Sequence, residues 1–247
     1  MFKYSILFFL LSCTQIVKQF DDEYYEVIDN KTNSEYLNLI FSHNINGEAH
    51  PCGCRNFPLG GLPQVAGELH SLREKTPLLY VDSGDALFPS TLIPDFLKDS
   101  QIFTAKKIAE SFDKNKLDYF LPGDQDFANG EDFLADISHK HKFQFIISNI
   151  KKSTKIKHKK WIAKKFGQRT LVFMGVVDPS LLQQDIRSLF FSPQIGINET
   201  LAEVKKQFGT LDDITIVLLS HSGMDTDKRY AEEFPDLDWI IGSHSQA

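Results

Sequence analysis

Short apolar runs alternate with amphipathic stretches along the chain from Tyr36 onward. The runs are rich in β-branched and aromatic residues, as in buried strands, whereas the stretches between them repeat their apolar residues at helical spacing. This alternation predicts an α/β fold of βαβ units with mostly parallel strands. We expect strands at Leu37–Ser42, Leu78–Asp82, Tyr119–Leu121, Phe145–Ser148, Thr170–Gly175, Ile214–Leu219 and Trp239–Ile241, and helices at Pro63–Lys75, Asp95–Lys114, Glu131–His141, Asn198–Phe208 and Asp225–Phe234.

The N-terminus has the pattern of a targeting segment. Lys3 precedes a short apolar run, Ile6–Leu11, which is too short for a transmembrane helix of about 20 residues. A cation followed by such a run is typical of a secretory signal, although a buried first strand is the alternative. Leu10–Cys13 resembles a bacterial lipobox, so residues 1–13 are expected to be a lipoprotein signal peptide with Cys13 lipidated. The protein is then expected in the bacterial cell envelope, facing the periplasm or the surface, with the membrane as a partner through the lipid.

Two further segments stand out beside the predicted domain. Residues 14–34 are polar and acidic and are expected to form a tether, so that the domain covers residues 35–247. The stretch Lys151–Lys165 carries eight lysines. A solvated hairpin or loop is the favoured interpretation of this stretch, and a basic binding patch is the alternative.

Composition narrows the functional classes. The 247 residues include 27 Lys+Arg and 33 Asp+Glu, which gives a net charge of −6, and 42% of the residues are hydrophobic. These values are ordinary for a globular domain and exclude a disordered chain, a fibre and a polytopic membrane protein. The acidic balance gives no support for nucleic acid as a partner, because nucleic-acid-binding domains are usually basic.

Polar residues follow four of the predicted strands at their carboxyl ends. These segments read Asp82-Ser83-Gly84-Asp85, Pro122-Gly123-Asp124-Gln125-Asp126, Ser220-His221-Ser222-Gly223 and Gly242-Ser243-His244-Ser245-Gln246. Ligands of open α/β sheets gather at the carboxyl ends of strands. Carboxylates and imidazoles together are suitable ligands for Zn²⁺, Mn²⁺ or Fe²⁺. The sequence therefore predicts a divalent metal site formed by Asp85, Asp124, His221 and His244.

This arrangement resembles the metallophosphoesterase (calcineurin-like) superfamily, and within it the N-terminal catalytic domain of secreted 5′-nucleotidases. The matching segments are Gly60-Gly61-Leu62, LLYVDSGDALF at 78–88, IVLLSHSGMDTD at 216–227 and PDLDWIIGSHSQ at 235–246. The resemblance implies a β-sandwich of two sheets flanked by helices, in four layers αββα, with two metal ions at the strand ends. It also implies hydrolysis of small phosphoesters, with a small phosphorylated molecule or anion as the partner.

The resemblance also assigns metal ligands residue by residue. It places the bridging carboxylate at Asp85 and the second-metal ligands at Asp124, His221 and His244, with Asp124 in place of the usual Asn. The last first-metal ligand falls on Gln246. The Asp-x-His pair of the first metal is replaced by Asn44 and Asn46, whose neutral amide oxygens bind divalent cations more weakly than a carboxylate and an imidazole. We therefore expect one tightly bound divalent ion (Zn, Mn or Fe), with Asn44 and Asn46 as weak ligands.

The catalytic groups implied by the family are also replaced. Gln125 stands where the family has the His that protonates the leaving group, and Ala128 lies near the position of its partner Asp. Glutamine is not a general acid, and loss of such a group typically costs about 10²–10⁴ in rate. We therefore expect weak hydrolysis, with a non-catalytic metal- or anion-binding lipoprotein as the alternative.

A Cys-Gly-Cys segment marks the chain as a divergent relative of the superfamily. Cys52 and Cys54 are too few for a disulfide framework, and they could form a structural or oxidised loop, bind a softer metal or act in redox chemistry. Ala247 directly follows the last ligand segment, whereas the family continues with further strands. The fold is thus expected to be shortened at its C-terminus.

The lipobox generates the first prediction. In a bacterial host that processes lipoproteins, the mature protein should begin at Cys13 and partition into the detergent phase of a Triton X-114 extraction. Cys13→Ser should move it to the aqueous phase, because the acyl chains are lost. Cys52→Ser serves as the matched control and should leave the partition unchanged. An unchanged detergent fraction for Cys13→Ser would contradict the lipoprotein assignment.

Overall fold

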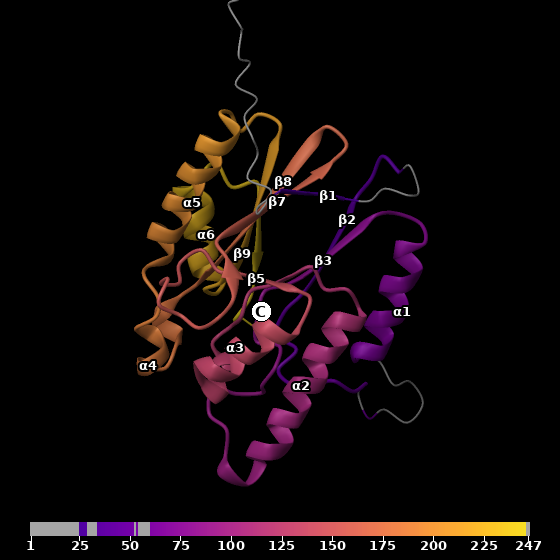
Figure 1. Ribbon diagram of the computed structural model, residues 1–247, viewed down its shortest axis with the longest axis vertical. Coiled ribbons are helices and arrows are strands. Elements are labelled where there is room, and N and C mark those ends of the chain that lie inside the picture. Colours follow the sequence, from indigo (N-terminus) through magenta and orange to yellow (C-terminus); the bar gives the residue numbers. More distant parts are fainter. Residues whose placement is uncertain (1–24, 29–33, 52, 54–59, 246–247) are drawn as a thin grey trace, which may run out of the picture.

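Two β-sheets form the centre of the computed structural model, which describes residues 25–28, 34–51, 53 and 60–245 (Figure 1). In the first sheet, all neighbouring strands are parallel, in the order β2 (Asn38–Ser42), β3 (Leu78–Asp82), β4 (Tyr119–Phe120), β5 (Gln144–Ile146) and β6 (His158–Lys159). The second sheet is mixed, because β7 and β8 pair antiparallel. Its order is β1 (Tyr25–Val27), β7 (Trp161–Phe166), β8 (Arg169–Val177), β9 (Ile214–His221) and β10 (Trp239–Gly242).

Helices cover the outer face of each sheet. The first sheet is covered by α1 (Leu62–Arg73), α2 (Lys98–Lys114) and α3 (Gly130–Lys140), and the second by α5 (Pro193–Phe208) and α6 (Met224–Glu233). The connections contain the short helix α4 (Gln184–Arg187) and the 3₁₀ turns η1 (Asp95–Leu97), η2 (Gln125–Asn129) and η3 (Pro179–Leu181). The four layers αββα confirm the predicted fold class.

The alternation of side chains along β8 shows how one strand serves two cores. Phe173 and Val177 join the core between the sheets, whereas Val172 and Met174 pack in the core beneath α5 and α6. Successive residues of a strand point to opposite faces, so this apolar run is buried on both sides. The ring of Phe173 meets that of Tyr119 from the other sheet at 4.9 Å between centroids.

The sheets approach closely where β5 ends against β8. The backbone N–H of Ser148 donates to the carbonyl of Gly175 at 2.6 Å, and the Gly175 N–H donates to Ser148 Oγ at 3.1 Å. A Cβ at Gly175 would collide with the carbonyl oxygen of Ile146. Glycine at this position therefore permits the contact that joins the two sheets.

All twelve predicted elements are present among the described residues, with ends that differ by a few residues. Three strands were not predicted. Tyr25–Val27 lies in the segment expected to be a tether, yet it forms β1, an edge strand parallel to β7. The lysine-rich stretch contains β6 and β7. The interpretation of that stretch as a solvated hairpin is incomplete, because Trp161, Ile162 and Ala163 of β7 are buried. The lysines around these residues obscure their apolar pattern in the sequence.

No helix within the described ranges is long and apolar enough to cross a membrane.

Candidate metal centre

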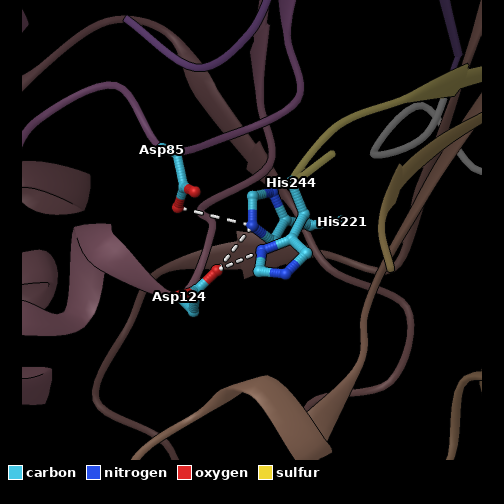
Figure 2. Close-up of side chains that lie close together, drawn as sticks. All are labelled: Asp85, Asp124, His221 and His244. Atoms are coloured by element: carbon cyan, nitrogen blue, oxygen red, sulfur yellow. Dashed lines mark hydrogen bonds and ion pairs between the residues drawn. The ribbon is translucent and has the colours of Figure 1, made fainter. Parts of the chain in front are cut away.

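Four neighbouring strand ends bring the predicted ligands together. Asp85 follows β3, Asp124 follows β4, His221 ends β9 and His244 follows β10 (Figure 2). The first two strands belong to one sheet and the last two to the other, and within each pair the strands are parallel. The site therefore lies where the carboxyl ends of the two sheets meet, as the sequence predicted.

The geometry of these side chains is compatible with one bound ion. Each of the four residues offers a ligand atom, and these atoms all lie within 4.8 Å of one another. Asp124 Oδ1 lies 2.8 Å from His221 Nε2 and 3.0 Å from His244 Nδ1, and Asp85 Oδ1 lies 3.3 Å from His221 Nε2. Two carboxylates and two imidazoles match the ligand chemistry of Zn²⁺, Mn²⁺ and Fe²⁺, so the residues fit a divalent metal.

The backbone fixes the orientation of His221. Its Nδ1 lies 3.0 Å from the carbonyl oxygen of Ser83, which can accept a hydrogen bond from Nδ1–H, so that the Nε2 lone pair would be available to a metal. Burial alone would lower the pKa of His221, but its hydrogen bonds to Asp124 and Asp85 outweigh burial and raise the pKa to about 10. The imidazole is therefore held in a strongly negative environment, which favours any cation.

Two further carboxylates lie beneath the ligands. Among the described residues, Asp82, Asp85, Asp124 and Asp126 are each at most 8% exposed. Burial raises the pKa of Asp82 to about 8, and burial together with the charge of Asp85 raises the pKa of Asp126. Asp85 and Asp124 both lie against the His221 ring in a buried site, and a divalent cation would offset the repulsion between these two carboxylates.

Asp126 connects the two loops that carry the carboxylate ligands. Its Oδ2 accepts the backbone N–H of Asp85 at 2.9 Å and of Gly123 at 2.7 Å. Its Oδ1 accepts those of Ala86 at 3.0 Å and Leu87 at 2.7 Å. Sequence analysis missed this residue, whose one signal was an acidic residue two positions after a ligand. Asp126 thus positions Asp85 without facing the ion itself.

The backbone of the site adopts conformations that side chains rarely allow. Asp85 and His244 have positive φ values of 57° and 73°, and Asn44 and Asn46 have 51° and 54°. Such strain in residues with a Cβ persists where the surrounding structure imposes it, and it clusters at functional sites. Here, hydrogen bonds between the loops after β2, β3 and β10 hold these residues at positive φ.

Close packing around the ligands also requires glycine at two positions. A Cβ at Gly84 would lie 2.8 Å from His221 Nδ1, and one at Gly123 would collide with Asp85 Oδ1 and His221 Cε1. The loops after β3 and β4 can therefore approach His221 only because these two residues lack side chains.

Asn44 has a role that the sequence did not reveal. Its Oδ1 accepts hydrogen bonds from Ser243 Oγ at 3.0 Å and from the backbone N–H of His244 at 3.3 Å, and its Nδ2 donates to the carbonyl of Ser245 at 3.3 Å. The side chain that was expected to be a weak ligand therefore connects the loop after β2 to the segment that presents His244.

Asn46 and Gln125 also contact the loop of Asp85, but through their backbones. The Asn46 N–H donates to the Asp85 carbonyl at 2.7 Å, and the Gln125 N–H donates to Asp85 Oδ1 at 2.9 Å. Within the part of the chain that the structure describes, Asn46 Oδ1 and Gln125 Oε1 are buried without a hydrogen-bond partner. The placement of Gln125 at the catalytic position stays a prediction.

Four predicted site residues lie outside the described residues: Cys13, Cys52, Cys54 and Gln246.

The ligand set predicts the metal content. We expect about one tightly bound divalent ion per chain, and His244→Ala should abolish tight binding because His244 supplies one of the four ligand atoms. The measurement is elemental analysis after dialysis, together with the shift in Tm on adding Mn²⁺ or Zn²⁺. His70→Ala, on the exposed face of α1, is the control and should retain the ion. Two tightly bound ions in the unmodified protein would contradict the prediction.

The hydrogen bonds of Asp126 predict a loss of both stability and metal affinity. Asp126→Asn places an amide NH₂ against backbone N–H donors, which should lower the free energy of unfolding by about 2–4 kcal/mol. Displacement of Asp85 should weaken metal binding by about 10–100-fold. Urea unfolding and metal titration measure the two effects. Asp136→Asn, which alters an exposed carboxylate on α3, should change neither; unchanged metal affinity in Asp126→Asn would refute the positioning role.

Solved structures similar to this chain were found, although no family model matches the sequence and no curated protein is significantly similar to it. The NAD nucleotidase of Haemophilus influenzae has a TM-score of 0.68 at 21% identity and covers 85% of this chain and 38% of its own. A putative 5′-nucleotidase of Staphylococcus aureus has a TM-score of 0.68 at 18% identity, with 84% of this chain and 45% of its own covered.

The calcineurin-like phosphoesterase YfkN of Bacillus subtilis has a TM-score of 0.66 at 19% identity and covers 84% of this chain and 71% of its own. This chain thus spans less than half the length of the two nucleotidases. The chain therefore has the metallophosphoesterase fold and resembles the N-terminal domain of 5′-nucleotidases.

Proposed function

We propose that the protein is a phosphoester hydrolase that depends on one divalent metal ion (Zn, Mn or Fe) and acts weakly on small phosphoesters. The observation that carries the proposal is the convergence of Asp85, Asp124, His221 and His244 at the strand ends of a metallophosphoesterase fold. The similar proteins include a nucleotidase and a calcineurin-like phosphoesterase by name, which supports phosphoester chemistry for this site.

The four ligands place the ion where a substrate can reach it. The side chain of His244 is 36% exposed, whereas that of His221 is fully buried. A divalent ion held here would act as a Lewis acid toward phosphoryl oxygens. Asp85, Asp124 and His221 would hold the ion from the buried side, and the partly exposed His244 would hold it on the side that solvent reaches.

Gln125 limits the reaction to substrates with good leaving groups. It lies next to the ligand Asp124, where an acid for the leaving oxygen would be required, and its amide cannot donate a proton in this way. An aryl phosphate releases a stabilised phenolate when its P–O bond breaks, so it needs little help from an acid. A nucleoside 5′-phosphate releases the nucleoside as an alkoxide, so it depends strongly on an acid.

The sequence alone supports the location of this activity. The lipobox-like segment that ends at Cys13 favours a lipid-anchored protein of the bacterial cell envelope, where the membrane would be a partner through the acyl chains. Its substrate would then be a small phosphorylated molecule outside the cytoplasm.

A non-catalytic protein that binds a metal or an anion is the second candidate. Two observations favour it: Gln125 has no acidic group, and Asn44 uses its amide to hold the segment of His244. Such a protein would bind one divalent ion as tightly as the enzyme would, but it would show no turnover. Catalysis, measured with the ion bound, separates the two candidates.

The missing acid predicts how activity depends on the leaving group. With Mn²⁺ or Zn²⁺ present, the protein should cleave p-nitrophenyl phosphate slowly and AMP almost not at all. Gln125→His should raise AMP hydrolysis at least about tenfold, because it restores an acid, and should change aryl phosphate hydrolysis little. Gln125→Asn is the matched control without an acid.

Three results would count against these assignments. Fast AMP hydrolysis by the unmodified protein would show that another group supplies the proton. An equal gain in AMP hydrolysis for Gln125→Asn would show that the gain does not depend on an acid at position 125. No turnover of any aryl phosphate by the metal-loaded protein would favour the non-catalytic candidate.

A further inference from the structure

Positive charge is concentrated in one part of the chain. Residues 137–177 contain 11 Lys and Arg and no Asp or Glu, whereas the rest of the chain has the other 16 Lys and Arg against all 33 Asp and Glu. The segment therefore carries a formal charge of +11 and the rest carries −17. Such an asymmetry indicates an anionic partner. The metal centre does not account for it, because none of its four ligands lies in this segment.

The fold gathers much of this positive charge beside strand β6. A hollow of about 490 Å³ lies between β6, the end of β5 and helix α5. A second hollow of about 170 Å³ shares His158 and Lys159 with the first, so the two are continuous. The lysines that line them form the basic surface: Lys142, Lys151, Lys152, Lys157, Lys159 and Lys160.

The acidic residues among the described lining of the two hollows are Glu199 and Glu203 of α5. Both are already engaged by one lysine, because Lys160 Nζ lies 3.0 Å from Glu199 Oε2 and 2.8 Å from Glu203 Oε1. Glu203 Oε2 also accepts a hydrogen bond from Trp161 Nε1 at 3.2 Å. The other five lysines of the basic surface are therefore not neutralised by these two glutamates.

Three lysines of the basic surface have free ammonium groups. Lys142, Lys152 and Lys157 are exposed, and within the described ranges their ammonium groups form no hydrogen bond or ion pair. Lysines on an edge strand can serve to prevent pairing with another chain. Since none of these three belongs to β6 (His158–Lys159), protection of that strand does not explain them.

The chain enters the described fold close to the basic surface. Strand β1 is parallel to β7, and Tyr25 pairs with Ala163, three residues after Lys160 (Figure 1). Between Tyr25 and the lipidation site proposed at Cys13 lie 11 residues. Even fully extended, these residues span at most about 40 Å. A lipid at Cys13 would therefore keep the basic surface within reach of the bilayer.

We propose that the basic surface docks the domain onto the anionic lipid headgroups of the membrane. Acidic headgroups attract lysines near the bilayer and repel the negative charge on the rest of the chain, so the contact has a preferred orientation. A lipid anchor combined with a basic patch holds a protein on a membrane better than either does alone. The membrane is favoured over nucleic acid as the partner, because the anchor brings the membrane to this surface. The contact goes beyond the anchor and does not depend on hydrolysis.

The first test is vesicle flotation of the full chain carrying Cys13→Ser, which lacks the acyl chains. At about 0.1 M salt it should bind vesicles of phosphatidylcholine and phosphatidylglycerol at least about tenfold better than vesicles of phosphatidylcholine alone. The preference should disappear at about 1 M salt, because salt screens exposed charges. The apolar N-terminal run is the same in both measurements, so the ratio reports the headgroup contact and is independent of lipidation.

Charge reversal locates the contact. The triple variant Lys142→Glu/Lys152→Glu/Lys157→Glu should lower the preference for anionic vesicles at least about tenfold, because each lysine near the bilayer contributes. The matched control reverses three exposed lysines that line neither hollow and has the same net charge: Lys75→Glu/Lys98→Glu/Lys228→Glu. This control should retain most of the preference.

Three results of the flotation experiment would overturn the proposal. The first is equal binding of the Cys13→Ser chain to neutral and anionic vesicles. The second is an equal loss of preference in the two triple variants, which would show that net charge alone decides binding. The third is tighter binding of a DNA duplex than of anionic vesicles at the same salt, which would assign the surface to nucleic acid.

The second test uses the lipid-anchored full chain without charge reversal, so it does not depend on how the variants fold. Acetylation of lysines, followed by mass spectrometry, should be at least about fivefold slower at Lys142, Lys152 and Lys157 in anionic vesicles than in neutral ones. Acetylation of the three control lysines should be the same in both. Equal acetylation of the two groups in both kinds of vesicle would overturn the proposal.

Discussion

The metal centre depends on the buried carboxylate of Asp126. Its two oxygens accept four backbone N–H groups, three from the loop after β3 and one from the loop after β4. Without such an acceptor, four buried donors would lack partners, and each would cost about 1–3 kcal/mol. Because these bonds fix the backbone on both sides of Asp85, they also set its positive φ and the direction of its side chain. The position of one ligand is therefore decided by a residue that does not face the ion.

The cluster of aspartates and histidines and the neighbouring Asn44 differ in their contacts. Asp85, Asp124, His221 and His244 have ligand atoms that face one another, and the buried negative charge around them favours a cation. On the other side, the side-chain amide of Asn44 forms hydrogen bonds with the segment that carries His244. The Asn44 side chain therefore supports the segment that carries His244.

The sequence by itself predicted most of the elements, the α/β class and the four residues whose side chains converge at the strand ends, because apolar periodicity and the polar residues after each strand are local signals. It did not reveal β1, β6 and β7, whose pairing depends on strands far away in the chain and, for β6 and β7, is hidden by lysines. Only the tertiary structure showed the hydrogen bonds that Asp126 accepts from the loop after β3 and the amide contacts of Asn44. These bonds join segments about 40 to 200 residues apart and leave no pattern in the local sequence.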